Sequence, residues 1–384
     1  MIVSYKTEID PTQEQIQKIN QTIGTCRYIY NFYLATQKER YEHGEKLQSA
    51  MDFSKWLNNY YLPQHEELSW IKEVSSKSVK QSITNAYSAY QRFFKKQSKF
   101  PRFKKKGKSD VKMYFVKTDA KSVIWCERHR IKIPTVGWVK LKEKGYIPTT
   151  KSGFVIKSGT VSEKAGRYYV SVLVDVPQKE VEKPTNQGIG IDLGIKDLAI
   201  CSNGQTFNNI NKTQEVKRLE KKLKREQRSL SRMYENLKKG GSTQKNIQKQ
   251  TRKVQRIHHR LDNIRIDYIN KSIAKIVKTK PSYITIEDLN ITGIMKNRHL
   301  SKAISQQRLY EFRNKLTNKC HQNNIEIRIV DRWFPSSKIC HCCGYVKKDL
   351  RLSNRTYTCT CGYVADRDYN ASLNLRDCKD YQIA

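Results

Sequence analysis

The sequence predicts a multidomain α+β protein, in which a helical domain and a small β-barrel precede an α/β domain that carries an inserted metal-binding ribbon. Three observations predict this class. The spacing of apolar residues changes from three or four to two near residue 110. Strand and helix patterns alternate after residue 187, which is typical of an α/β sheet. Five of the ten cysteines lie between residues 340 and 361.

The charge of the chain indicates a polyanionic partner. Lysine and arginine number 74 in 384 residues against 36 acids, a formal net charge of +38. Nucleic acid is the first candidate, because each neutralised phosphate releases counterions. A membrane is disfavoured, since the charge is spread along the chain and no apolar stretch approaches about 20 residues. With no signal-peptide pattern, we expect a cytoplasmic, nucleoid-associated protein of bacteria or archaea.

The first domain is expected to be helical over residues 11–109. Asp10 and Pro11 are a suitable start for a helix, and apolar residues recur at helical steps over residues 76–96. Its basic end, residues 99–107, interleaves aromatic residues with cations. This pattern fits either a loop that grips a nucleic-acid backbone or a solvated linker anchored by two phenylalanines.

Residues 1–10 and 110–178 are expected to form the β-barrel. Alternating patterns predict a strand over residues 2–8 and a hairpin about Lys164–Gly166. Further strands are predicted at residues 111–116, 130–133 and 138–141, and the hairpin strands at 154–162 and 167–176. The polar residues 178–186 then predict a linker.

The order of elements after the linker is typical of an RNase H-like fold, over residues 187–335 and 363–384. Two strands over 188–202, a helical hairpin, a strand over 282–287, a helix over 300–318, a strand over 325–330 and a last helix from Asp368 are expected. The hairpin, residues 211–278, is strongly basic: residues 211–280 hold 22 lysines and arginines against 6 acids. We therefore expect it to face phosphates.

Three acids occupy the positions at which such a fold gathers carboxylates. Asp192 lies on the first strand, Glu287 ends a later strand, and Asp368 begins the last helix. Three carboxylates brought together repel one another unless divalent cations neutralise them, which is the logic of two-metal phosphodiester cleavage. Oxygen ligands suit Mg²⁺ or Mn²⁺. The competing acids are Asp197, which would point away if it lay in a hairpin turn, Asp288, on the other strand face, and Asp366, a candidate helix cap.

The cysteine cluster predicts a four-cysteine zinc ribbon over residues 336–362. Two knuckles, each with glycine after its second cysteine, offer Cys340, Cys343, Cys359 and Cys361 as ligands of Zn²⁺. The second knuckle has one residue between its cysteines instead of two, so His341 and Cys342 are possible substitutes. Closed, four-coordinate ligation indicates a structural metal.

With these motifs in view, the chain resembles the TnpB family, transposon-associated RNA-guided DNA endonucleases related to type V CRISPR effectors. The sequence around Asp192, residues 286–289, the cysteine ribbon and residues 366–372 match that family's RuvC-type nuclease pattern. The short second knuckle and Ser372, where alanine is common, depart from it. The N-terminal parts resemble the family's helical recognition domain and β-barrel wedge domain through weaker motifs.

The resemblance implies a guide RNA derived from the transposon end and cleavage of double-stranded target DNA beside a short motif, with base pairing supplying sequence choice. A monomer bound to RNA is expected. By family analogy, Lys77, Lys80 and Gln81 read the motif, while Arg102 and Lys104 belong to the gripping loop. Two alternatives stay open: a nuclease-inactive RNA-guided repressor, and a transposase or resolvase that needs no guide.

Overall fold

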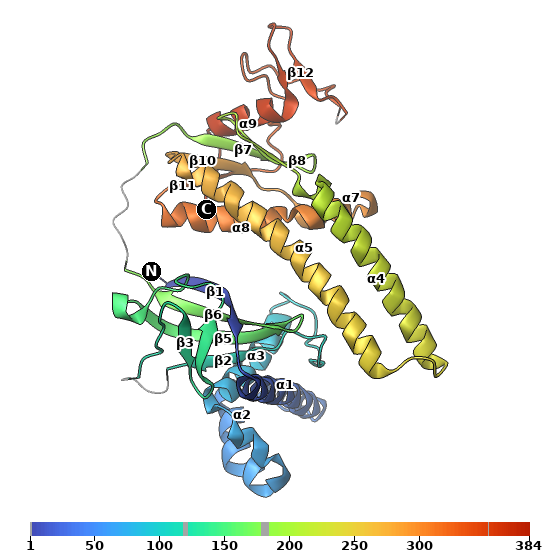
Figure 1. The fold of residues 1–384 in the computed structure, drawn as a ribbon. Coiled ribbons are helices and arrows are strands. Elements are labelled where there is room, and N and C mark those ends of the chain that lie inside the picture. The colour runs from blue at the N-terminus through green and yellow to red at the C-terminus, as the bar shows by residue number, and fades with distance from the viewer. Residues whose placement is uncertain (1, 118–121, 178–183, 352) are drawn as a thin grey trace. The chain divides into compact units, whose positions relative to one another are not determined.

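The computed structural model describes residues 2–117, 122–177, 184–351 and 353–384 (Figure 1). The chain divides into two compact units, Met1–Lys179 and Glu180–Ala384, and each is described by itself. Most of the predicted linker, residues 178–183, lies outside the described residues.

The helical part of the first unit is built on a long helix, α1 (Gln13–Glu42). The helix begins later than the sequence predicted, because Thr12 and Gln15 form a reciprocal capping box and Asp10 ends the preceding strand. An aromatic-rich core that includes Tyr33 and Phe53 joins α1 to the other helices. These are α2 (Ala50–Trp56), η1 (Leu57–Tyr61), η2 (Leu62–Gln64), η3 (Glu66–Glu73) and α3 (Ser76–Phe94).

The β part of the same unit is a six-stranded sheet in the order β2-β5-β6-β1-β4-β3. Its strands are β1 (Ile2–Asp10), β2 (Met113–Val116), β3 (Arg130–Ile133), β4 (Gly137–Leu141), β5 (Val155–Lys164) and β6 (Arg167–Asp175), with η4 (Thr150–Ser152) before the last pair. Residues of the two edge strands, such as Phe115 and Ile133, share one core, so the sheet curls into the expected barrel. In the described part of the chain, no hydrogen-bonded pairing joins β2 to β3.

The second unit contains a mixed sheet in the order β14-β11-β10-β7-β8-β9. It is formed by β7 (Ile189–Leu193), β8 (Asp197–Cys201), β9 (Thr206–Asn208), β10 (Tyr283–Glu287), β11 (Glu326–Val330) and β14 (Gln382–Ile383). The first three strands are antiparallel, and β10 and β11 run parallel to β7. This order is that of the predicted RNase H-like fold.

The two faces of this sheet differ in character, and the alternation along β7 explains why. Ile189 and Ile191 point into the main core, which also contains residues of α5 (Gln244–Lys278) and α8 (Leu309–Gln322). Gly190 and Asp192 therefore face the opposite side, where α9 (Arg367–Asp377) packs. Figure 1 shows the sheet with α9 on one side and α5 and α8 on the other.

The basic hairpin has the predicted form, with α4 (Gln214–Lys238) lying against α5. Every lysine and arginine of α4 is exposed. The single helix expected over residues 300–318 is wrong, because α7 (Arg298–Gln307) and α8 are separate. Arg308 between them has a left-handed backbone with φ of 55°, and its guanidinium pairs with Asp262 and Glu311. Two short helices, η5 (Ile210–Lys212) and α6 (Ile291–Ile294), complete this part.

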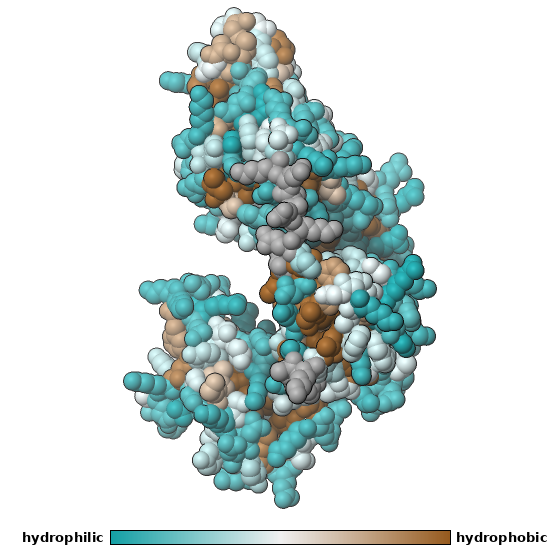
Figure 2. All heavy atoms as spheres, turned by 90° about the vertical axis from the view of Figure 1, so that its left-hand side faces the viewer, coloured by the Kyte–Doolittle hydropathy of each residue, from teal (hydrophilic) through white to brown (hydrophobic). Residues whose placement is uncertain are grey.

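The ribbon follows β11 and contains the small hairpin of β12 (Thr356–Thr358) and β13 (Val364–Asp366). No helix among the described residues is long and apolar enough to cross a membrane. The face drawn in Figure 2 is predominantly hydrophilic, with hydrophobic side chains in small groups.

Candidate functional site

Asp192 and Glu287 lie at the same level on neighbouring parallel strands. The register pairs Ile191 of β7 with Ile286 of β10, so the next residue on each strand is one of these two acids. Both acids lie at the carboxyl ends of their strands and at the same edge of the sheet, because parallel strands share a direction: Glu287 is the last residue of β10, and Asp192 is the last but one of β7. The strand pairing therefore brings together two residues that are 95 positions apart in the sequence.

Asp368 reaches the same place because α9 packs unusually close to β7. A Cβ atom added to Gly190 would lie 2.0 Å from the carbonyl oxygen of Ser372 and 2.4 Å from the backbone nitrogen of Arg376. Only glycine permits this approach. Asp192 lies two residues beyond Gly190 on the same strand face, so its side chain is directed at the first turn of α9, which carries Asp368.

The competing acids have other partners or positions. Asp366 caps α9, as the sequence suggested, by accepting hydrogen bonds from the backbone N–H groups of Asp368 and Tyr369 at 2.9 and 3.1 Å. Asp288 forms ion pairs with Arg313 and Arg332 at 2.5 and 2.9 Å. Asp197 begins β8 outside the turn, so the condition for it to point away is not met, and it lines the same cavity as Asp192.

The three carboxylate residues line one cavity of about 520 Å³. The lining also includes five cations, Lys196, Arg332, Lys338, Arg355 and Arg367. Asp368 is held by Arg367 at 2.8 Å and by Arg355 of the ribbon at 3.5 Å. A pocket lined by both acids and cations suits an anionic substrate that is bound through metal ions.

The electrostatics of the cavity favour bound cations. Removal from water raises the pKa of Asp192 well above its usual value, and the nearby charges of Glu287 and Asp368 raise it further. Burial also raises the pKa of Glu287, and the hydrogen bond from the hydroxyl of Ser336 partly offsets this rise. Such a cluster is destabilising when fully ionised, and divalent cations would relieve it. The oxygen donors and their mutual repulsion therefore fit Mg²⁺ or Mn²⁺.

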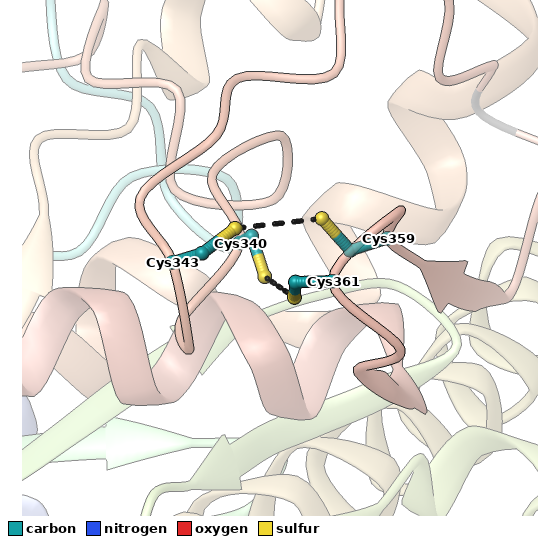
Figure 3. A group of neighbouring side chains, drawn as sticks. All are labelled: Cys340, Cys343, Cys359 and Cys361. Carbon is teal, nitrogen blue, oxygen red and sulfur yellow. Dashed lines mark hydrogen bonds between the residues drawn. The ribbon is translucent and has the colours of Figure 1, made fainter.

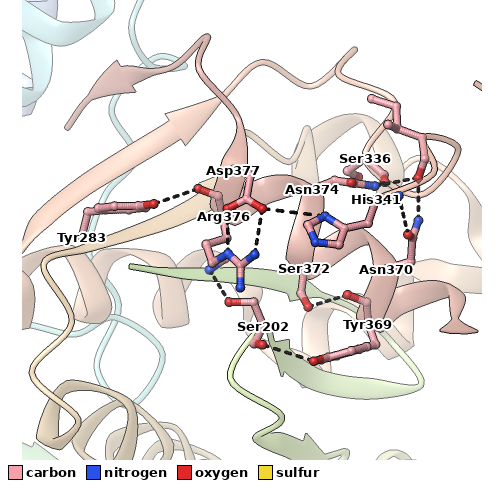
Figure 4. Close-up of polar contacts among 12 residues, drawn as sticks. Ser202, Tyr283, Ser336, His341, Tyr369, Asn370, Ser372, Asn374, Arg376 and Asp377 are labelled. Atoms are coloured by element: carbon pink, nitrogen blue, oxygen red, sulfur yellow. Dashed lines mark hydrogen bonds and ion pairs between the residues drawn. The ribbon is translucent and has the colours of Figure 1, made fainter. Parts of the chain in front are cut away.

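A hydrogen-bond network positions Glu287 from the ribbon side, and Figure 4 shows Ser336, Asn370 and Asn374 of this network. The buried Ser336 donates its hydroxyl to Glu287 Oε1. Asn374 of α9 in turn donates to the carbonyl oxygens of Ser336 and Ile339, both at 2.7 Å. Asn370 also donates to Ile339 and accepts the backbone N–H of His341. The helix that carries Asp368 therefore also fixes the stem of the ribbon, which contacts Glu287.

The second site is a cluster of the four predicted cysteines, whose sulfur atoms all lie within 4.8 Å of one another. Figure 3 shows them converging from two segments, with Cys340 and Cys343 each 3.6 Å from a cysteine of the other knuckle. A zinc tetrahedron with bonds of about 2.3 Å has sulfur–sulfur edges of roughly 3.8 Å. The cluster therefore fits Zn²⁺. Among the described residues, no other group of three or more acids, cysteines or histidines brings its possible ligand atoms this close together.

The short second knuckle closes by a tighter turn. In the first knuckle the N–H of Gly344 bonds to the carbonyl of Cys340, four residues back, and in the second the N–H of Gly362 bonds to that of Cys359, three residues back. Both glycines have a positive φ, which the turns require. A hydrogen bond from the backbone N–H of Cys361 is the main cause of the lowered pKa of Cys359, which is about 6. The Cys359 thiol therefore ionises readily, as binding to a metal cation requires.

Neither possible substitute belongs to this cluster. Cys342 is exposed and lies outside the compact group, and His341 faces Asp377, with 3.7 Å between Nδ1 and Oδ2. All ten cysteines are free thiols, and no disulfide forms in the described chain.

Comparisons with known proteins bear on the whole chain. A family model described as "Probable transposase" matches residues 171–298, one described as "Cas12f1-like, TNB domain" matches 310–375, and a "Helix-turn-helix domain" model matches 1–46. The "Putative RNA-guided DNA endonuclease" of Streptomyces pristinaespiralis is 32% identical over 97% of this chain and 88% of its own. "Putative RNA-guided DNA endonuclease InsQ" of Escherichia coli K12 is 31% identical, over 97% and 91%.

The chain belongs to the TnpB family. Its fold is also that of a solved protein, in a structure titled "Cryo-EM structure of the Cas12f1-sgRNA-target DNA complex". That match has a TM-score of 0.60 and 18% identity, over 97% of this chain and 84% of the other. The expected fold class is therefore confirmed: a helical part and a β part, followed by an RNase H-like α/β domain with an inserted four-cysteine ribbon. The structure does not show the two helices that the description "Helix-turn-helix domain" implies, since the described residues 2–46 form β1 and the single helix α1.

The N-terminal residues that the TnpB resemblance singled out lie on two surfaces of the first unit. Lys77 and Lys80 are exposed on α3, where Gln81 donates to Asn85 at 3.0 Å. Arg102 is exposed, whereas Lys104 is fixed to α1. Its backbone exchanges two hydrogen bonds with Asn31, and its ammonium lies 5.1 Å from the ring centre of Tyr30.

The two phenylalanines in the basic loop of this TnpB chain are about equally exposed, at 50% for Phe100 and 54% for Phe103. Phe100 also packs edge-on against Tyr90 and Phe93, at 5.7 and 5.3 Å between ring centres. Of the two anchors that the linker interpretation required, Phe100 is therefore a half-exposed one, and the exposure of Phe103 does not favour an anchoring role.

Sequence reasoning missed Ser336 and the exposed Trp333, which line the carboxylate cavity of this TnpB chain, and Asn374, which supports Ser336. Asn374 carried a signal, because it is polar at a position where the helical period of α9 places buried residues. Ser336 and Trp333 lie in an irregular segment whose sequence predicts no particular geometry.

Proposed function

We propose that this protein is a DNA endonuclease guided by RNA, which cleaves target DNA beside a short motif by phosphodiester hydrolysis. The observation that carries the proposal is the single cavity lined by Asp192, Glu287 and Asp368 in an RNase H-like sheet. The printed names of two relatives that match nearly the whole chain support it. The guide would derive from the transposon end and select double-stranded DNA by base pairing, which suits a net charge of +38.

The catalytic assignments belong to this proposal. Asp192, Glu287 and Asp368 would hold two divalent cations, which supply an activated water and stabilise the leaving oxygen. Glu287 is kept in place by Ser336, and Asp192 by the packing of β7. Arg332 and Lys338 at the cavity would hold the phosphates on either side of the cleaved bond. Arg355 and Arg367 balance the charge of Asp368.

The remaining assignments concern binding. Lys77, Lys80 and Gln81 would read the motif, and Arg102 and Lys104 would bind the nucleic-acid backbone. The ribbon would hold a structural Zn²⁺ at its four cysteines. Residues 1–10 with 110–178, 11–109, 187–335 with 363–384, and 336–362 would act as domains of a monomeric complex with RNA. The relatives named above are bacterial, and the protein would act on DNA in a bacterial cytoplasm.

The decisive experiment compares two neighbouring acids of α9. Asp368→Asn removes a carboxylate from the cavity, whereas Asp366→Asn keeps the helix cap because asparagine caps as well as aspartate. With purified protein, its guide and Mg²⁺, we expect Asp368→Asn and Asp192→Ala to lose more than about 10³-fold in cleavage rate. Asp366→Asn should cleave like the parent. Cleavage by Asp192→Ala at the parental rate would show that the site is misassigned.

The two alternatives give different results in the same assays. A repressor without nuclease activity would bind guided target DNA tightly and leave it intact in Mg²⁺. A guide-independent resolvase would carry no discrete RNA after purification and would cleave branched DNA unaided. Sequencing the RNA that co-purifies with the protein therefore separates the guided functions from the unguided one.

A further inference from the structure

Three consecutive residues after β11 have three different surroundings. Arg332 is held by the carboxylate of Asp288 at 2.9 Å. Phe334 packs against the small core of Val330, Leu375 and Cys378. Between them, Trp333 is 84% exposed, the most of any large hydrophobic residue in the described chain. It also lines the carboxylate cavity.

The position of Trp333 is set by a hydrogen-bonded turn. The carboxylate of Asp331 accepts the backbone N–H of Trp333 at 2.8 Å, and the carbonyl of Asp331 accepts the N–H of Phe334 at 3.1 Å. Because Arg332 and Phe334 are held on either side, the backbone of Trp333 is fixed, and its indole extends into solvent from a defined position. A large aromatic residue presented in this way, with its ring in solvent, has the arrangement of a binding group rather than of a core residue.

The surroundings of the ring indicate the chemistry of its ligand. Arg332, Lys338 and Arg355 line the same cavity and offer cations for phosphate groups. A flat apolar ring next to several cations is the combination by which proteins bind single-stranded nucleic acid, with bases stacked on aromatic side chains and the backbone neutralised. A buried peptide anchor would instead require an apolar groove around the indole, whereas the lining here is mainly charged or polar.

We propose that Trp333 is a stacking platform for one unpaired nucleobase, next to the phosphodiester that enters the carboxylate cavity. This inference rests on the proposed function. It adds a base-binding position to the cleavage site, through which the strand would be held in register. Trp333 acts here as a positioning residue, since the reacting atoms lie at the carboxylates.

The test uses the guide-bound full-length protein with Asp192→Ala, so that target DNA stays intact. 2-Aminopurine, whose fluorescence is quenched by stacking, is placed at successive positions of the opened target strands. We expect one position, or two adjacent ones, at which emission is low and rises severalfold when Trp333→Ala is added. Trp333→Phe should restore most of the quenching. The control Tyr310→Ala removes a ring that is 64% exposed on α8 and does not line the cavity, so it should change nothing.

Cleavage kinetics with intact Asp192 provide the second measurement. Trp333→Ala should raise the concentration needed for half-maximal single-turnover cleavage between about fivefold and 150-fold, the usual range for one lost base–aromatic stack. An abasic site at the position found by fluorescence should raise the half-maximal concentration of the parent by the same factor. It should not raise that of Trp333→Ala any further. Emission independent of Trp333 at every position would overturn the stacking role and leave the endonuclease proposal intact. Failure of the parent to bind guided target would overturn both.

Discussion

The carboxylate cavity and the cysteine cluster are two candidate metal sites of one unit, and they are assembled in opposite ways. The carboxylates come from β7, β10 and α9, which are far apart in the sequence and meet only because the sheet and Gly190 bring them together. The cysteines come from two local turns, each closed by a backbone hydrogen bond to its glycine. The first site therefore depends on the tertiary fold, and the second mostly on its own knuckles.

The two sites also differ in what they need from a metal. The four sulfur atoms already lie within 4.8 Å of one another, and two of the pairs are 3.6 Å apart, close to the edge of a zinc tetrahedron. The carboxylates repel one another, and arginines or a hydroxyl hold Asp368 and Glu287. A cation should thus complete the fold of the ribbon, whereas at the cavity it should relieve a repulsion that the rest of the fold enforces. Four substitutions test this contrast.

The largest effect is expected from Gly190→Ala. The added methyl group would overlap the backbone of α9, which cannot move without displacing Asp368 and the stem of the ribbon. We expect a loss of about 3 kcal/mol or more in the free energy of unfolding, measured by urea denaturation. Gly241→Ala is the control, because its added Cβ would be 3.7 Å from the nearest atom. An equally stable Gly190→Ala variant would contradict the close-packing account.

Loss of one thiol should abolish zinc binding while the sheet stays folded. Cys359→Ser should reduce the zinc content from one ion per chain to nearly none and increase amide hydrogen exchange in the ribbon. Cys342→Ser, a neighbouring exposed thiol outside the cluster, should keep its zinc. The contrast between the sites would fail if Cys359→Ser lost protection equally in β7 and β10.

A smaller effect should follow from removing the hydroxyl that holds Glu287. Ser336→Ala should reduce the cleavage rate about 10- to 100-fold, as is usual when the group that orients a metal ligand is lost. Raising the Mg²⁺ concentration should recover part of the rate, and zinc content should not change. Ser353→Ala, at an exposed serine of the ribbon that does not line the cavity, is the control. Equal rates for the two variants would show that the hydroxyl has no positioning role.

The smallest effect concerns the stability of the metal-free protein. Because the pKa of Asp192 is raised on folding, its ionisation costs stability as the pH rises from about 4 through the raised value. Asp192→Asn should therefore raise Tm by a few degrees at pH 7–8, and the gain should vanish near pH 4. Mg²⁺ should stabilise the parent but not this variant. Asp267→Asn, on the exposed surface of α5, should behave like the parent at every pH.

The sequence predicted most of the strands and the order of the elements along the chain, because alternation and helical spacing record which side of an element is buried. It also predicted which four cysteines converge, since two knuckles followed by glycines are local patterns. The break at Arg308 was hidden, because its left-handed backbone is held by Asp262 and Glu311 from elsewhere in the fold. Ser336 was equally hidden, because its role depends on Asn374 and Glu287, which no local pattern links to it.

Asn370 and Asn374 of α9 connect the carboxylate cavity to the ribbon. They donate hydrogen bonds to the segment that runs from Ser336, beside Glu287, to Ile339, directly before the first cysteine of the ribbon. Bacteria grown without enough zinc should therefore make a protein that cuts DNA poorly even when magnesium is plentiful. An ion that takes no part in the chemistry would then limit how often a mobile element's nuclease acts.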